Sequence, residues 1–113
     1  AEGENHVRMA LRLMLDNEES LMIVGEASTP ESLIAQVCLQ SPDIILLDGG
    51  LPGLHPQRLI TVIKKCCPEA RIVITSVRPE IENTMMEIGA DAFLPKQLLP
   101  DEYIWTLLSI IDK

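Results

Sequence analysis

The sequence predicts an α/β protein in which helices cover both faces of one parallel sheet, a doubly wound three-layer αβα fold. Helical and strand periodicity alternate along the chain, with short connections between them. Ile44 to Leu47 form a continuous apolar run, typical of a strand buried on both faces. A length of 113 residues is enough for one core, so we expect residues 1–113 to form a single domain.

Four short segments have strand character and end at turn-forming residues. They are Leu21–Val24, Ile44–Leu47, Arg71–Thr75 and Ala92–Leu94. Apolar residues at helical spacing predict five helices around these strands. The helices are centred on Val7–Leu15, Leu33–Cys38, Leu59–Cys66, Ile81–Ile88 and Ile104–Leu108. The resulting order is αβαβαβαβα.

Turn and cap residues set several of the helix ends. Thr29-Pro30-Glu31 has a capping hydroxyl, a proline at the first helical position and an acid in the first turn, which predicts a helix start. Gly89 can cap the helix before it, and the last helix is expected to begin near Pro100-Asp101.

The predicted pattern begins with a helix, so the strand that should precede it is absent or reduced to Ala1-Glu2. Such a strand would lie centrally, between Leu21–Val24 and Ile44–Leu47. Its absence would leave backbone polar groups unpaired in the core, which folded proteins avoid. We therefore expect the chain to be part of a longer one or to borrow a strand from a neighbour.

The composition argues for a soluble, cytoplasmic protein that does not bind DNA directly. No apolar run approaches the roughly 20 residues needed to span a bilayer, and no secretory signal is evident. The net charge is −8, and the only adjacent basic pair is Lys64-Lys65, too little to neutralise phosphates. We therefore expect proteins or a metal cation, rather than DNA, as binding partners. The odd number of cysteines, Cys38, Cys66 and Cys67, predicts reduced thiols.

Polar side chains follow each predicted strand and should meet at one edge of the sheet, where open α/β sheets bind ligands. They are Glu2 and Glu4, Asp48, Thr75 and Ser76, and Lys96. Carboxylates suit Mg²⁺, while the ammonium and hydroxyl groups can neutralise a transferred phosphoryl group. The sequence therefore predicts a phosphoryl-transfer site, although a frayed acidic terminus explains Glu2 and Glu4 equally well.

Over nearly its whole length the chain resembles the receiver domain of two-component response regulators. The matching stretches are residues 7–12 (VRMALR), 24–27 (VGEA), 42–53 (PDIILLDGGLPG), 75–76 (TS) and 89–96 (GADAFLPK). The resemblance implies a flavodoxin-like fold. The first two stretches are most similar to receivers that precede helix-turn-helix output domains.

The resemblance also implies residue roles. Asp48 would be the phosphoacceptor, and Lys96 would pair with the phosphoryl group. Thr75 would be the hydroxyl that contacts this group, with Ser76 as the alternative because the spacing from Asp48 is short. Phe93 would be the aromatic residue that changes rotamer on activation.

The metal site implied by the resemblance is made of Glu2, Asp48 and the backbone carbonyl of Gly50. The chain departs from the family here, because Gly3 stands where a second adjacent acid is expected and Glu4 comes one position late. We therefore expect Mg²⁺ as the cofactor, bound with one carboxylate fewer.

The resemblance implies that a sensor histidine kinase or phosphotransfer protein donates a phosphoryl group to Asp48, which then changes a surface for an output domain or a second protomer. No enzymatic activity beyond self-phosphorylation and dephosphorylation is expected. The alternative is a degenerate receiver that acts as an interaction module without phosphorylation. The nucleotide-binding and hydrolase motifs GxGxxG, GxxxxGK[ST] and GxSxG are absent, which disfavours those classes.

Overall fold

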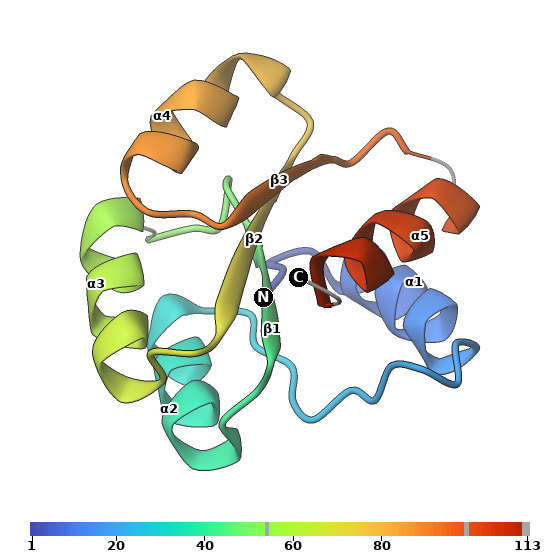
Figure 1. The fold of residues 1–113 in the computed structure, drawn as a ribbon, viewed down its shortest axis with the longest axis horizontal. Coiled ribbons are helices and arrows are strands. Elements are labelled where there is room, and N and C mark those ends of the chain that lie inside the picture. Colours follow the sequence, from blue (N-terminus) through green and yellow to red (C-terminus); the bar gives the residue numbers. More distant parts are fainter. Residues whose placement is uncertain (54, 99, 112–113) are drawn as a thin grey trace.

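The computed structural model describes residues 1–53, 55–98 and 100–111 and has a parallel three-stranded sheet between two layers of helices (Figure 1). In chain order the elements are α1 (Asn5–Asp16), α2 (Pro30–Gln40), β1 (Ile44–Asp48), α3 (Pro56–Cys66), β2 (Arg71–Ser76), the 3₁₀ helix η1 (Pro79–Ile81), α4 (Glu82–Glu87), β3 (Ala92–Pro95) and α5 (Pro100–Ile111). Helices α2, α3 and α4 cover one face of the sheet, and α1 and α5 cover the other (Figure 1). The predicted doubly wound three-layer fold is confirmed.

The strand order is β1-β2-β3, and both pairs are parallel. The β1–β2 register runs from the pair Ile44 and Arg71 to the pair Asp48 and Thr75. The β2–β3 register ends with Ser76 opposite Pro95. Because all three strands run the same way, their carboxyl ends reach one edge of the sheet together.

The core is divided between the two faces of the sheet, because successive side chains of a strand point to opposite faces. Leu47, Ile72 and Ile74 are fully buried against the α2–α4 layer. Val73 and Leu94 pack on the other face with residues of α1 and α5. Burying one such side chain stabilises the fold by roughly 1.5–3 kcal/mol.

Helix boundaries follow the predicted caps. The Thr29 hydroxyl accepts a hydrogen bond from the Ser32 N–H at 3.1 Å, and Pro30 is the first residue of α2. Gly89, just after α4, has a φ of +114°, which glycine adopts without the clash that a side chain would cause. Helix α5 begins at Pro100, as expected.

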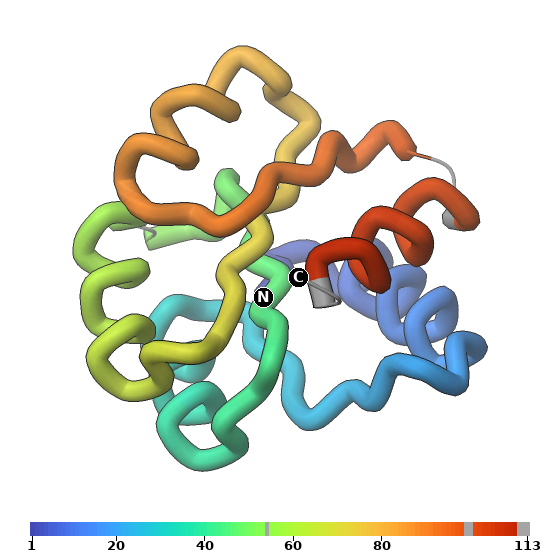
Figure 2. The backbone as a smooth tube through the Cα atoms, in the orientation of Figure 1, coloured from blue at the N-terminus to red at the C-terminus, as the bar shows by residue number. Residues whose placement is uncertain are grey.

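The predicted strand Leu21–Val24 is wrong. This segment belongs to an extended stretch, residues 21–27, without ladder pairing, and the tube in Figure 2 shows it running between α1 and α2. Ala1 and Glu2 lie between this stretch and β1, and the Glu2 N–H donates to the Ala27 carbonyl at 3.0 Å. The Ala1 ammonium donates to the Leu46 carbonyl, and the Ala1 carbonyl accepts from Asp48 N–H at 2.9 Å. Among the described residues no segment pairs with residues 21–24, because a strandlike local pattern does not by itself supply a ladder partner.

The predicted reduced thiols are also wrong for two cysteines. Cys38 of α2 and Cys66 at the end of α3 form a disulfide, with their Cα atoms 5.6 Å apart, and Cys67 is free. The prediction used only the count of cysteines, whereas the packing of α2 against α3 brings these two side chains to bonding distance. Over the part of the chain that the structure describes, no helix is long and apolar enough to cross a membrane.

Candidate functional site

The carboxyl edge of the sheet brings together Glu2, Asp48 and Lys96, three of the predicted site residues. Lys96 Nζ lies 2.6 Å from Glu2 Oε2 and 3.1 Å from Asp48 Oδ1. The three residues come from the N-terminal segment, the end of β1 and the residue after β3. The ammonium therefore joins two carboxylates that are 46 residues apart in the sequence.

Glu2 is not part of a frayed terminus, since the residue is only 4% exposed. Its backbone N–H donates to the Ala27 carbonyl at 3.0 Å, and its carbonyl accepts from the Arg8 guanidinium at 2.9 Å. Arg8 therefore helps to position Glu2. These bonds fix the Glu2 carboxylate beside Lys96.

Position 3, where the second acid is expected, is crowded by Pro52. A Cβ atom added to Gly3 would lie 3.0 Å from Cδ of Pro52, so a side chain there would displace the proline. Glu4 is exposed and stands at the N-cap position of α1 without a capping hydrogen bond from its side chain, and its N–H donates to Glu2 Oε1 at 3.3 Å. The structure thus places Glu2 in the site and leaves Glu4 outside it.

Asp48 has one carboxylate oxygen engaged and one open. Oδ1 accepts from Gly50 N–H at 3.0 Å and faces the Lys96 ammonium. Oδ2 has no hydrogen-bond partner within residues 1–53, 55–98 and 100–111, and the side chain is 13% exposed. The open oxygen can act as a nucleophile, while the engaged oxygen holds the carboxylate in place.

Lys96 supplies the positive charge that lies between the two carboxylates of the site. Burial alone would lower the pKa of its ammonium, but hydrogen bonds to Glu2 and Asp48 raise that pKa above the ordinary value of 10.5. Lys96 is therefore charged at neutral pH. Two carboxylates against one ammonium leave a local excess of negative charge, which favours a second cation.

The donor atoms fit Mg²⁺, which prefers oxygen ligands and keeps several of its own waters. Carboxylate oxygens of Glu2 and Asp48 converge on one point, now taken by Lys96 Nζ, and Gly50 follows two residues after Asp48. Among the described residues no group of three acidic, histidine or cysteine side chains could hold a metal. The two carboxylates are the side-chain ligands that this edge offers, and the Gly50 carbonyl is the further ligand that the resemblance implies.

Thr75 and Ser76 are both buried at the end of β2, but on opposite faces. Thr75 stands beside Asp48 in the ladder and shares a face with Val73. Ser76 shares a face with Ile74, which pairs with Phe93. The Ser76 hydroxyl accepts from Arg78 N–H at 2.9 Å, and its carbonyl accepts from Lys96 N–H at 2.9 Å.

Tyr103 of α5 was not predicted as a site residue. Its hydroxyl is buried and has no hydrogen-bond partner among the described residues. Burial first, and the nearby Glu2 charge second, raise the pKa of this phenol. The signal in the sequence is its position four residues before Leu107 on the inward face of α5.

The family profile of the response regulator receiver domain matches residues 1–107. The chain belongs to this family. Receiver domains are regulatory parts of two-component systems. The nitrate/nitrite response regulator protein NarL of Escherichia coli (strain K12) is 29% identical over 103 residues, which are 89% of this chain and 48% of NarL. The chain spans about half the length of the curated relatives it matches.

Solved structures show the same fold. A two-component response regulator of the LuxR family from Aurantimonas sp. SI85-9A1 has a TM-score of 0.89 and 22% identity, covering 98% of this chain and 81% of that one. A response regulator from Burkholderia pseudomallei, solved with a phosphorylated aspartic acid, calcium ion and citrate, has a TM-score of 0.81 and 17% identity, covering 98% of this chain and 65% of that one. At these identities the likeness concerns the fold, which is flavodoxin-like as predicted.

Proposed function

We propose that residues 1–113 act as one receiver domain in which Asp48 accepts a phosphoryl group from a phosphohistidine of a sensor histidine kinase or phosphotransfer protein. The observation that carries this proposal is the open Oδ2 of a carboxylate whose other oxygen is held by Gly50 N–H and faces Lys96. An acceptor needs a free oxygen for attack and a neighbouring cation for the incoming charge.

In this reaction an Asp48 oxygen attacks phosphorus, the bond to the donor imidazole breaks, and the imidazole leaves with the bonding electron pair. The product is an acyl phosphate on Asp48. Lys96 would move from its carboxylate partners toward a phosphoryl oxygen. Glu2, Asp48 and the Gly50 carbonyl would hold Mg²⁺, which supplies further neutralisation of phosphoryl charge when bound.

The hydroxyl that senses the phosphoryl group must also influence Phe93, the proposed switch residue. The sequence favours Thr75 for this role, and Thr75 lies beside Asp48 in the ladder. The faces of the sheet favour Ser76, because its side chain shares a face with Phe93 and its carbonyl binds the Lys96 backbone. The rearranged surface would then engage an output domain or a second protomer.

The phosphorylation is tested by adding a small phosphodonor and Mg²⁺ to the chain and measuring intact mass. We expect one added phosphoryl group per chain, none without Mg²⁺, and none in the Asp48→Asn variant. An equal mass gain in Asp48→Asn would contradict the assignment. No gain in the native chain would point to an interaction module that works without phosphorylation.

The switch hydroxyl is tested by the NMR signals of the Phe93 ring before and after phosphorylation. We expect the phosphorylation-induced shift to be lost in Ser76→Ala and kept in Thr75→Val. The reverse result would assign the role to Thr75.

A further inference from the structure

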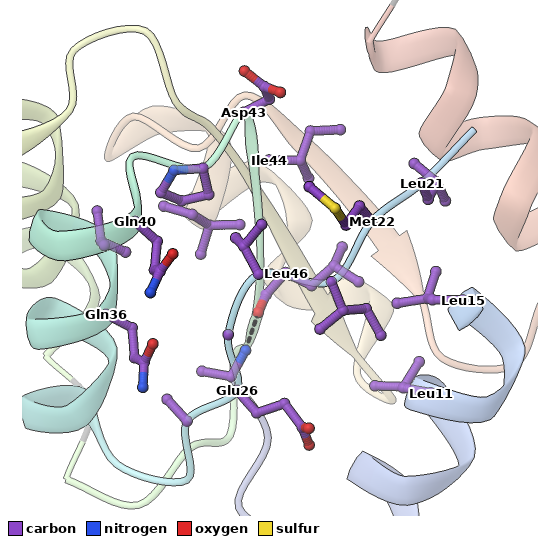
Figure 3. Close-up of a pocket in the computed structure, with 18 of the residues that line it drawn as sticks. Leu11, Leu15, Leu21, Met22, Glu26, Gln36, Gln40, Asp43, Ile44 and Leu46 are labelled. Atoms are coloured by element: carbon purple, nitrogen blue, oxygen red, sulfur yellow. Dashed lines mark hydrogen bonds between the residues drawn. The ribbon is translucent and has the colours of Figure 1, made fainter. Parts of the chain in front are cut away.

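The strand side chains of the site lie on the face of the sheet that α1 and α5 cover. Figure 3 shows Leu11 and Leu15 of α1 directed toward β1 on this side. Each strand contributes one apolar side chain to a row on this face, and the row consists of Leu46, Val73 and Leu94. Because successive side chains of a strand point to opposite faces, the residues two positions later form the next row on the same face. These residues are Asp48, Thr75 and Lys96.

Tyr103 of α5 packs against the apolar row next to the site. It belongs to one buried cluster with Val73 and Leu94, and only 5% of its surface is exposed. Rows on one face are about 7 Å apart along a strand, so the ring lies one row away from the site. The Glu2 carboxylate raises the pKa of this phenol, second to burial, which shows that the hydroxyl lies within electrostatic reach of that charge.

The Tyr103 hydroxyl is a donor without an acceptor. It is buried and makes no hydrogen bond to the described residues. An unpaired buried hydroxyl destabilises a fold, and native proteins contain few such groups. Because burial raises the pKa of the phenol, the hydroxyl keeps its proton at neutral pH and can donate a hydrogen bond.

Glu2 is an acceptor that changes partner in the proposed reaction. In the structure its Oε2 is paired with Lys96 Nζ at 2.6 Å, and its Oε1 accepts a long bond from Glu4 N–H at 3.3 Å. When Lys96 turns toward the phosphoryl group, the buried Glu2 carboxylate loses its counter-charge, which is costly unless other groups replace it. The two oxygens of a carboxylate offer about four acceptor positions, enough for a metal ion and a hydroxyl together.

We propose that Tyr103 is a positioning residue of the receiver site, whose hydroxyl donates a hydrogen bond to the Glu2 carboxylate once Lys96 leaves that carboxylate for the phosphoryl group. This inference rests on the proposed function, because that function supplies the movement of Lys96. The bond holds Glu2 in place while Lys96 is away, and it ties α5 to the N-terminal segment. Since the bond forms only in the phosphorylated chain, it favours that form over the resting one.

The bond is tested first without phosphorylation, in the Lys96→Met variant. The 113-residue chain has one tyrosine, so labelling tyrosine with ¹³C at Cζ gives a single NMR signal that reports on its hydroxyl. We expect this signal to move in Lys96→Met, which leaves Glu2 without its ammonium. The signal should return to its native position in Lys96→Met/Glu2→Leu, which has no carboxylate to accept the bond. A signal that does not move in Lys96→Met, or that stays moved in the double variant, would overturn the proposal.

The second test uses beryllium fluoride with Mg²⁺, a reversible mimic of the phosphoryl group, and measures its affinity for the chain by ¹⁹F NMR. In Tyr103→Phe, which keeps the ring, we expect the affinity to fall at least about fivefold, because a hydrogen bond to a charged group is lost. Trp105→Phe lies on the same helix at a residue that is 71% exposed, and this matched control should bind as tightly as the native chain. Equal affinities of the native chain and Tyr103→Phe would contradict the role of Tyr103.

Urea unfolding separates this positioning role from a structural one. Without ligand, Tyr103→Phe should unfold at no lower urea concentration than the native chain, because it removes a hydroxyl that has no partner among the described residues. A lower midpoint would assign the hydroxyl a bond in the resting chain and overturn the proposal. The proposed function itself fails if the native chain neither gains mass from a phosphodonor nor binds beryllium fluoride, whereas binding that is equal in the native chain and Tyr103→Phe refutes the role of Tyr103 alone.

Discussion

Strand β1 has very different neighbours on its two edges. Toward β2 it forms a continuous parallel ladder, and on that side Leu47, Ile72 and Ile74 are fully buried. Toward residues 21–27 its backbone bonds, within the described part of the chain, are to Ala1, and a cavity of about 550 Å³ lies between β1 and that segment. The site at the carboxyl edge is nevertheless assembled, because Glu2, Asp48 and Lys96 all meet there. Stability and site geometry therefore depend on different parts of the sheet.

The largest predicted effect comes from matched isoleucine-to-alanine substitutions on the two sides of β1, compared by their free energies of unfolding. Ile72→Ala, on the completed side, should lower the free energy of unfolding by about 3 kcal/mol, because it leaves a cavity in the packed core. Ile23→Ala, beside the cavity between β1 and residues 21–27, should cost about 1 kcal/mol or less, since its neighbours are already incompletely packed. Urea unfolding of both variants measures this. Equal losses of unfolding free energy in the two variants would show that the surroundings of Ile23 are packed as firmly as those of Ile72.

The disulfide joins α2 to α3 and should add a comparable amount of stability. Cys38→Ser should lower the free energy of unfolding by about 3 kcal/mol, because the bond closes a loop with a sequence separation of 28. Cys67→Ser removes a free thiol and serves as the matched control, with little expected effect. Three titratable thiols in the folded native chain would contradict the bond.

A smaller effect is expected for Lys96→Met, which leaves the buried Glu2 carboxylate without its partner. The expected loss is about 2 kcal/mol of unfolding free energy, and Glu2→Gln should recover part of it, because a neutral amide needs no counter-charge. Urea unfolding of the two single variants and the double variant gives the coupling free energy between Glu2 and Lys96. Strictly additive costs would show that the pair does not interact.

The same ion pair sets a pH dependence. Because the pKa of Lys96 in the folded chain lies above 10.5, its contribution is complete below that pH and is lost as the pH rises through the folded pKa. Unfolding free energy should therefore fall less between pH 10 and 12 in Lys96→Met than in the native chain. Identical pH profiles would contradict a raised pKa.

The sequence was sufficient for the elements that are regular and locally encoded. Thr29-Pro30 marks the start of α2, and the apolar run before Asp48 marks β1, because caps and burial leave local patterns. Leu21–Val24 has an equally strandlike pattern but forms no ladder, because a strand depends on a partner that local sequence does not supply.

The predicted site residues divide in the same way. Asp48 and Lys96 could be found because they end strands that do form, and Glu2 because it precedes the first helix. The crowding of position 3 by Pro52 could not, since it depends on packing between distant segments, and Tyr103 left only the weak signal of its spacing to Leu107.

The most direct test of the central claim is to locate the phosphoryl group after treatment with a phosphodonor and Mg²⁺. Borohydride converts an aspartyl phosphate to homoserine, which peptide mapping identifies by residue. Conversion at Asp48 alone, absent in untreated chain and greatly reduced in Lys96→Met, is the predicted result. Conversion elsewhere in the chain, or at Asp48 to the same extent in Lys96→Met, would contradict a site in which Lys96 compensates the charge that Asp48 accepts.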